Sequence, residues 1–213
     1  MKSFKTFLIE NQQVKCDIDG ICRVIKTYES AGNEEKILGV YKDSKGLLTL
    51  GHGHLVNENS PNIIGKVIKD PERVKKILAG EDKMTPDEAD SVLRNDVESR
   101  LPIVKRLAPD FDNYSPELQA ELASETFRGM TGQSPKALAL LNAGEFDAAA
   151  KEYLNAKEYR ESVKNKTGIA KRMDNLANAI KMEGQRRAKA RAASAQTTQG
   201  QMNSSTSQTA PSR

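Results

Sequence analysis

The sequence predicts an α+β fold that is mostly helical, with a small β-hairpin lobe near its N-terminus. Hydrophobic residues make up 37% of the 213 residues but aromatic residues only 5%, so the core must be mainly aliphatic. Two short apolar runs flank a turn signal within residues 37–52, and repeated helix-start signals follow beyond residue 60. The length fits one domain with a subsidiary lobe.

The first element that we expect is a helix over residues 17–30, because apolar residues recur there on one helical face. Asp17 or Asp19 can cap its start, and Gly32 can end it. The residues on this face, at positions i, i+3, i+4 and i+7, are Ile21, Val24, Ile25 and Tyr28.

A hairpin should follow this helix. The apolar runs 37–41 and 47–52 surround Asp-Ser-Lys-Gly at residues 43–46, which is a turn sequence. We therefore expect a small β lobe over about residues 30–60 and a helical lobe over about 84–183.

Three Ser/Thr-Pro pairs mark helix starts in the helical lobe, since the hydroxyl can cap the helix and proline fits its first position. Acidic residues follow two of these pairs in the first turn, where the helix dipole favours them. The pairs are Thr85-Pro86, Ser115-Pro116 and Ser134-Pro135, and further helices are predicted for residues 145–154 and about 168–183.

Both ends of the chain look different from the domain between them. Residues 184–213 are Ala, Ser, Thr, Gln and Arg with little to bury, and we expect them to be disordered. At the other end, residues 1–16 form an extension in which Phe4, Phe7 and Leu8 allow one more helix.

Charge and composition exclude several classes of protein. Residues 184–213 hold five basic residues and no acid, and because the formal net charge is +4, residues 1–183 carry a net charge of −1. A nearly neutral body argues against a dedicated nucleic-acid domain. Cys16 and Cys22 have no zinc-site spacing, and no stretch is apolar enough for a membrane span or a secretory signal.

The run YKDSKGLLTLGHGHL at residues 41–55, preceded by Glu29, resembles the signature of the phage T4-type lysozymes, glycoside hydrolase family 24. Residues 129–160 and the run GIAKR at 168–172 are similar to that family's C-terminal helical lobe. The resemblance covers about residues 17–183 and implies a lysozyme-like fold, with an interdomain helix within residues 84–106.

The resemblance implies a muramidase that cleaves the β-1,4 bond between N-acetylmuramic acid and N-acetylglucosamine in peptidoglycan. Glu29 would be the general acid, Asp43 the second carboxylate, and Thr49 a hydroxyl that helps to hold the attacking water. Leu55 and Phe127 match positions that line the cleft, although core packing is at least as good an explanation for each. His54, also expected to contact substrate, matches the family's His beside the cleft, where a structural hydrogen bond is the better interpretation. No cofactor or metal is implied.

Glycosidic chemistry independently requires residues of these types. A sugar leaving group needs a proton, and an oxocarbenium-like transition state needs a nearby negative charge. A general acid at neutral pH needs a pKa raised from about 4.3 to roughly 6 or 7, and the apolar stripe and the helix C-terminus around Glu29 would both act in that direction. In a symmetric hairpin, Asp43 and Thr49 would be near cross-strand neighbours, with Cβ atoms about 5 Å apart. The resemblance favours inversion of the anomeric centre.

Each residue alone has a simpler interpretation. Glu29 can be a solvated helix residue, Asp43 a turn former and Thr49 an ordinary strand residue, and only their joint spacing favours catalysis. His52 and His54 could share a strand face and hold a metal, but no third ligand has suitable spacing.

Four positions depart from the family pattern. The interval between Glu29 and Asp43 is longer by several residues, with residues 33–36 as the insertion, so we expect a bulging loop there. The other three are Arg128 in place of Gln, Glu158 in place of an aromatic residue and Met173 in place of a second Arg.

Two functions from different classes therefore remain. The first is an active muramidase of a phage, made in the host cytoplasm without a signal peptide and acting on the cell wall in the periplasm, either free or packaged in the virion. The second is a structural virion or wall-binding protein with an inactive lysozyme-like domain, whose termini bind other virion proteins. A chitinase-like substrate is a lesser variant of the first. The expected partner is peptidoglycan, with no specific nucleic acid.

Overall fold

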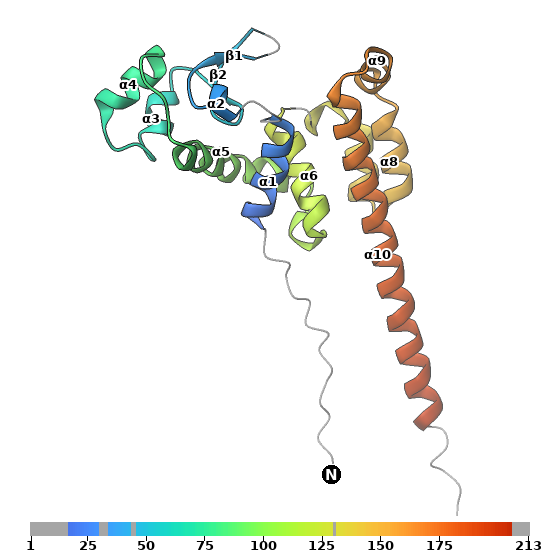
Figure 1. Ribbon diagram of the computed structural model, residues 1–213. Coiled ribbons are helices and arrows are strands. Elements are labelled where there is room, and N and C mark those ends of the chain that lie inside the picture. Colours follow the sequence, from blue (N-terminus) through green and yellow to red (C-terminus); the bar gives the residue numbers. More distant parts are fainter. Residues whose placement is uncertain (1–16, 30–33, 44–45, 130, 206–213) are drawn as a thin grey trace, which may run out of the picture.

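A computed structural model describes residues 17–29, 34–43, 46–129 and 131–205 of the chain. The described residues are mostly helical, with a small three-stranded antiparallel sheet near the N-terminus, which confirms the predicted α+β fold class. The helix considered for residues 1–16 lies outside the described ranges. Figure 1 shows the small lobe on one side, the helical lobe on the other, and α5 running between them.

Helix α1 (Ile18–Glu29) forms where the apolar stripe predicts it. Its N-terminus is capped by Asp17, whose Oδ1 accepts a hydrogen bond of 2.9 Å from the backbone N–H of Gly20. Ile21 and Ile25 are fully buried on the inner face of the helix. The last residue of α1 is Glu29, so the predicted acid stands at a helix C-terminus, as expected.

The hairpin forms around the predicted turn, but its strands are shorter than expected. Strand β1 (Tyr41–Lys42) pairs with β2 (Leu48–Leu50), which pairs with β3 (His54–Leu55). The first part of the run 37–41 is not a strand. Residues 34–37 form the short helix α2 (Glu34–Ile37), where a bulging loop was expected, because Ile37 is buried and anchors this turn of helix.

The helix starts predicted from Thr85 and Ser115 are confirmed. The Thr85 hydroxyl accepts from the N–H of Glu88 in a capping box, and the Ser115 hydroxyl accepts from the N–H of Leu118. The helices beyond the sheet are α3 (Ser60–Ile64), α4 (Pro71–Ala79), α5 (Pro86–Leu107), α6 (Pro116–Phe127), α7 (Pro135–Asn142), α8 (Phe146–Leu154), α9 (Lys157–Asn165) and α10 (Gly168–Ser205). Helix α9 was not predicted.

Helix α5 joins two separate hydrophobic cores. Its first turns contribute Ala89 and Val92 to the core of the small lobe, and Val97 and Val104 belong to the core of the helical lobe. The family's expected interdomain helix is therefore present at α5. Because the two cores do not merge, the surface between the lobes can form a groove.

Helix α10 corrects the expectation of disorder after residue 184. It continues to Ser205 and projects away from the domain, as Figure 1 shows. Alanine-rich sequence has high helix propensity, and extending a helix that already packs on the domain avoids the cost of nucleation. Every side chain from Ala188 to Ala195 is exposed, so this part of α10 is helical without burying apolar surface.

The anchor of α10 is Glu183, whose side chain is fully buried at 0% exposure. Its carboxylate accepts hydrogen bonds from the N–H of Ser115 and from Arg186 and Arg187. The Arg187 guanidinium also lies 5.0 Å from the ring centroid of Tyr114. The packed part of α10 therefore extends to residue 187.

A polar cluster fixes the turn between β2 and β3 against two helices. The buried ring of His52 donates from Nε2 to Asp90 Oδ1 at 2.9 Å, and Lys26 of α1 donates to Asp90 Oδ2 at 2.7 Å. Burial lowers the pKa of His52 despite its bond to Asp90.

Across the described residues, none of the helices has the length and apolarity to cross a membrane.

Truncation of α10 at two points tests where its packed part ends. A chain that ends at residue 195 should melt like the full chain, because the side chains from Ala188 to Ala195 are already exposed. A chain that ends at residue 182 should lose about 2 to 4 kcal/mol of unfolding free energy, since it leaves the Ser115 N–H unpaired and removes cation–π contacts. Denaturant unfolding measures both, and equal midpoints would contradict this account.

The lowered pKa of His52 predicts a stability that falls on mild acidification. The unfolded chain takes up a proton near pH 6.5, whereas folded His52 does so only at lower pH, so stability is lost as pH falls below about 6.5. His52→Gln keeps an N–H donor for Asp90 and should lose less stability between pH 8 and pH 5. Unfolding free energies across this range provide the test, and parallel curves for both proteins would refute it.

Candidate active site

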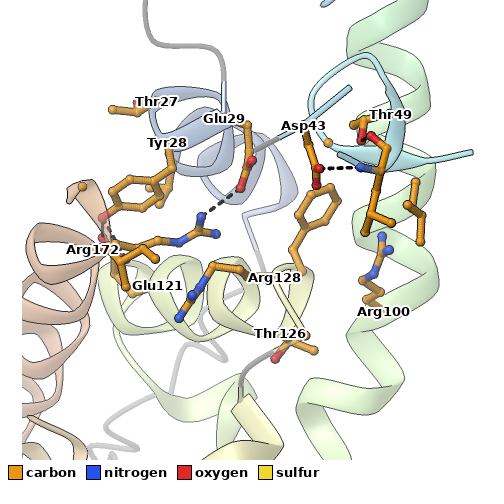
Figure 2. A pocket seen from close by; sticks show the side chains of 18 of the residues that line it. Thr27, Tyr28, Glu29, Asp43, Thr49, Arg100, Glu121, Thr126, Arg128 and Arg172 are labelled. Atoms are coloured by element: carbon orange, nitrogen blue, oxygen red, sulfur yellow. Dashed lines mark hydrogen bonds and ion pairs between the residues drawn. The ribbon is translucent and has the colours of Figure 1, made fainter. Parts of the chain in front are cut away.

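A groove of about 1360 Å³ lies between the two lobes and contains all three predicted catalytic residues in its lining. Figure 2 shows Glu29, Asp43 and Thr49 around one space, with α6 and α10 below Glu29. This volume exceeds that of most small-molecule pockets, which suits an extended ligand. Leu47, Leu55, Ile103, Leu107 and Phe127 supply an apolar part of the wall.

Glu29 is held by a cation rather than by apolar surroundings alone. Its Oε1 accepts a hydrogen bond of 2.8 Å from Arg172 of α10, and 27% of its side chain is exposed. Arg172 therefore adds a cation to the apolar stripe and the helix C-terminus that were expected around this acid. This contact is tertiary, because Arg172 lies 143 residues away in the sequence.

Glycine at position 53 leaves room for the other oxygen of Glu29. Gly53 has φ of +95°, and a Cβ atom there would lie 3.6 Å from Glu29 Oε2 and 3.0 Å from the ring of Phe127. Oε2 accepts no hydrogen bond from the residues that the structure describes, so it is the oxygen that can meet a ligand.

Arg172 is itself held from several sides. Its guanidinium donates to the backbone oxygen and the hydroxyl of Ser124, both at 2.8 Å, and it lies 4.7 Å from the ring centroid of Tyr28. Only 8% of its side chain is exposed. This fixed cation sets the position of Glu29.

Asp43 is fixed at the start of the hairpin turn. Its Oδ1 accepts from the N–H of Leu47 at 2.8 Å, and its own N–H donates to the Leu47 carbonyl at 2.9 Å. The register pairs Tyr41 with Thr49, so Thr49 is a diagonal neighbour of Asp43 rather than its direct partner. Diagonal neighbours lie about 7 to 8 Å apart, with their Cβ atoms somewhat closer, so this register implies a wider spacing than the direct pairing expected from sequence.

Thr49 is buried in the middle strand, where its hydroxyl donates to the Leu47 carbonyl at 3.2 Å. Its neighbour Tyr41 also lines the groove. Burial, followed by the negative charges of Glu29 and Asp43, raises the pKa of Tyr41 to about 12. Glu29 and Asp43 therefore both affect the pKa of Tyr41, as expected if the three residues belong to one site.

The three residues predicted to bind substrate differ in position. Leu55 is 44% exposed in the groove, and Phe127 lines the groove with Arg100 stacked 4.6 Å from its ring centroid. His54 is buried behind the groove wall, with its ring nitrogens bonded to Asp96 and Ser60. Its predicted substrate contact is corrected in favour of the structural alternative, because both nitrogens are occupied within the protein.

The two histidines considered for a metal site are each bonded to other residues of the protein. The two rings bond to different aspartates, Asp90 and Asp96. In the ranges that the structure describes, no three residues among His, Cys, Asp and Glu gather closely enough to hold an ion.

Two of the departures from the family pattern contact each other. Arg128 donates to Glu158 at 2.8 Å and to Glu125 at 2.9 Å, which ties the end of α6 to α9. Arg128, in place of Gln, and Glu158, in place of an aromatic residue, therefore form an ion pair with each other. Sequence inspection treated these two substitutions separately.

Sequence reasoning missed several groove residues. Arg172 lies in the run GIAKR that contributed to the resemblance, and this was the available signal for it. Tyr28 was assigned only to the buried helix face, and nothing in the local sequence marks Glu121 or Arg100 as lining a groove.

Two comparisons with known proteins show what this sequence is similar to. The sequence matches the family described as phage lysozyme over residues 26–175, a range that includes Glu29, Asp43, Thr49 and Arg172. The chain is also 30% identical over 118 residues to the peptidoglycan hydrolase gp36 of Enterobacteria phage SP6. That alignment covers 53% of this chain but only 12% of the phage protein, so the likeness concerns one segment of a much longer protein. Because the family match spans most of the chain and both lobes of the groove, this protein belongs to the phage lysozyme family.

Proposed function

We propose that this protein hydrolyses peptidoglycan as a muramidase, cleaving the β-1,4 bond between N-acetylmuramic acid and N-acetylglucosamine. Membership of the phage lysozyme family supports hydrolysis of the cell wall, as does the likeness to a phage peptidoglycan hydrolase. The observation that carries the proposal is the presence of Glu29 and Asp43 in the lining of one long groove.

Glu29 acts as the general acid in this mechanism. Arg172 holds Oε1, so the proton is carried on Oε2, which lies beside Gly53 and accepts no hydrogen bond among the described residues. Transfer of this proton to the glycosidic oxygen lets the sugar leave without a full negative charge on its oxygen. Because Arg172 fixes the carboxyl group, Glu29 needs little reorientation to reach the glycosidic oxygen.

Asp43 supplies the negative charge that an oxocarbenium-like transition state requires. The Leu47 N–H donates to its carboxylate at 2.8 Å, and the backbone N–H of Asp43 donates to the Leu47 carbonyl at 2.9 Å, so the turn holds this residue in place. In an inverting reaction a water molecule, held by Asp43 and by the hydroxyl of Thr49, attacks from the face opposite Glu29. Its oxygen bonds to the anomeric carbon as the glycosidic bond breaks, and Asp43 accepts its proton. The diagonal spacing of Asp43 and Thr49 leaves room for that water.

The apolar wall favours binding of a sugar polymer. Leu47, Leu55 and Ile103 are 39% to 47% exposed, and exposed large apolar side chains in a groove are typical of ligand contact. N-acetyl groups and sugar-ring faces can pack on such surface. The alternative function, a wall-binding protein without activity, would keep this wall but would not need the acid pair.

In this function the protein acts on the cell wall of the phage host. Delivery by the virion and release as a free lytic enzyme both serve that function. Docking of the termini to other virion proteins is compatible with either route.

Replacing the proposed acid tests the mechanism. Glu29→Gln should lower clearing of isolated sacculi by 10³-fold or more, roughly the loss expected when general acid catalysis and charge are both removed. The amide oxygen of Gln still accepts from Arg172, so the melting temperature should stay close to that of the original protein. Glu117→Gln, which changes an exposed acid outside the groove, is the matched control and should clear normally. Full activity of Glu29→Gln would remove this residue from catalysis.

Product analysis tests which bond is cut and with what stereochemistry. After digestion of sacculi and reduction with borohydride, mass spectrometry should find reduced muramic acid at the new chain ends. Reduced glucosamine would instead indicate a glucosaminidase. The first-formed anomer, followed by NMR, should be inverted, and a retained anomer would assign Asp43 the role of nucleophile.

A further inference from the structure

A second set of groove residues surrounds the cation that holds Glu29. Tyr28 precedes Glu29 on α1, and its ring lies over the Arg172 guanidinium at 4.7 Å. The Tyr28 hydroxyl donates to both carboxylate oxygens of Glu121, at 2.9 and 3.1 Å. Asn175 of α10 donates to the same hydroxyl at 2.7 Å. Figure 2 shows Tyr28, Glu121 and Arg172 together beneath Glu29.

These contacts leave the guanidinium little freedom. Ser124 on α6 accepts two of its hydrogen bonds, Glu29 on α1 accepts a third, and the aromatic ring restricts its plane. Arg172 Nε is buried and has no hydrogen-bond partner among the described residues. Because a buried N–H without a partner is unfavourable, the other contacts of Arg172 must be what holds it in this position.

Glu121 fixes the ring rather than the cation directly. A tyrosine hydroxyl bonded to a carboxylate and to an amide cannot rotate out of its plane without breaking both bonds. Burial raises the pKa of Tyr28 to about 12, so the phenol keeps its proton and remains a donor throughout the neutral range. The order of contacts is therefore Glu121 to Tyr28, Tyr28 to Arg172, and Arg172 to Glu29.

We propose that Tyr28 and Glu121 are positioning residues, which hold Arg172 against Glu29 and thereby set the pH above which Glu29 no longer donates its proton. The inference rests on the proposed function, because it concerns the acid of that reaction. Neither residue touches the reacting atoms. Their effect passes through the distance between a guanidinium and a carboxyl group, which is 2.8 Å in the structure.

Electrostatics gives the direction of the effect. A cation in contact with a carboxyl group favours its ionised form, so a loosened Arg172 lets Glu29 keep its proton to higher pH. Tyr41 of β1 and His52 of the turn between β2 and β3 interact electrostatically with Glu29, and both are unchanged in the variants below. The acids beside Arg172 are Glu121 and Glu125 of α6, and burial raises the pKa of Glu121 despite its bond to Tyr28. Both acids remain in place when the ring of Tyr28 is removed.

The basic limb of the pH–rate profile of kcat measures this effect. Tyr28→Leu removes the ring, and the limb should rise by about 1 pH unit, the lower end of the shifts that a neighbouring opposite charge produces. Tyr28→Phe keeps the ring but loses its anchor, so it should move the limb in the same direction by less. KM should change little in both variants, because Tyr28 is not one of the residues that form the apolar wall.

Glu121 provides a conservative pair of variants. Glu121→Gln still accepts the hydrogen bond of Tyr28 and should give a limb close to that of the original protein. Glu121→Leu removes the acceptor and should match Tyr28→Phe. The matched control is Tyr159→Phe, which removes an exposed tyrosine hydroxyl bonded to Asp174 at 2.7 Å, outside the groove lining, and should leave the profile unchanged.

An NMR titration of Glu29 separates this inference from the proposed function. With ¹³C-labelled glutamate, assigned through Glu29→Gln, the carboxyl signal of Glu29 should titrate at higher pH in Tyr28→Leu and Tyr28→Phe than in the original protein. A shifted titration in a protein that does not digest sacculi would support the positioning role and remove the function. An unshifted titration in both folded variants, or lower activity at every pH with an unmoved limb, would overturn the positioning role.

Discussion

The pairing of Arg172 with Glu29 is the interaction on which the rest of the site depends. A guanidinium that is 8% exposed must find charged and polar partners, because an uncompensated buried charge costs several kcal/mol. Its partners come from α1 and α6, while Arg172 itself belongs to α10. The acid end of the groove therefore exists only when the two ends of the domain have come together. A segment more than a hundred residues away determines which oxygen of Glu29 is left for a ligand.

The groove itself follows from a division of the hydrophobic core. Helix α5 gives its first turns to the small lobe and its later turns to the helical lobe, and no common core fills the space between. The hairpin brings Asp43 and Thr49 to one side of that space, while α1 brings Glu29 to the other. His52 strengthens this arrangement, since its bond to Asp90 holds the turn that contains Gly53 against α5. Glu29 and Asp43 thus face each other across the groove between the two lobes.

Local signals in the sequence predicted the fold well where the interaction that decides the structure is itself local. The caps at Asp17, Thr85 and Ser115 involve residues within three positions of each other, and all three formed as expected. Errors arose where distant contacts decide. A buried Ile37 turned an expected strand and loop into helix α2, and packing of Glu183 supports an α10 that composition alone assigned to disorder. Arg172 could be aligned with a family but not linked to Glu29 by spacing.

A count of the charged residues that line the groove overstates its positive charge, because some of these residues are paired with acids. The lining contains six basic residues and three acidic ones, which suggests a strongly cationic site. Arg128, however, gives its hydrogen bonds to Glu125 and Glu158, and Arg172 gives one of its bonds to Glu29. These two cations hold the protein together and add little net field. The remaining four basic and two acidic residues leave the lining with a smaller positive excess, beside an apolar wall. Arg128 and Glu158 therefore act together, because each is a charged partner of the other.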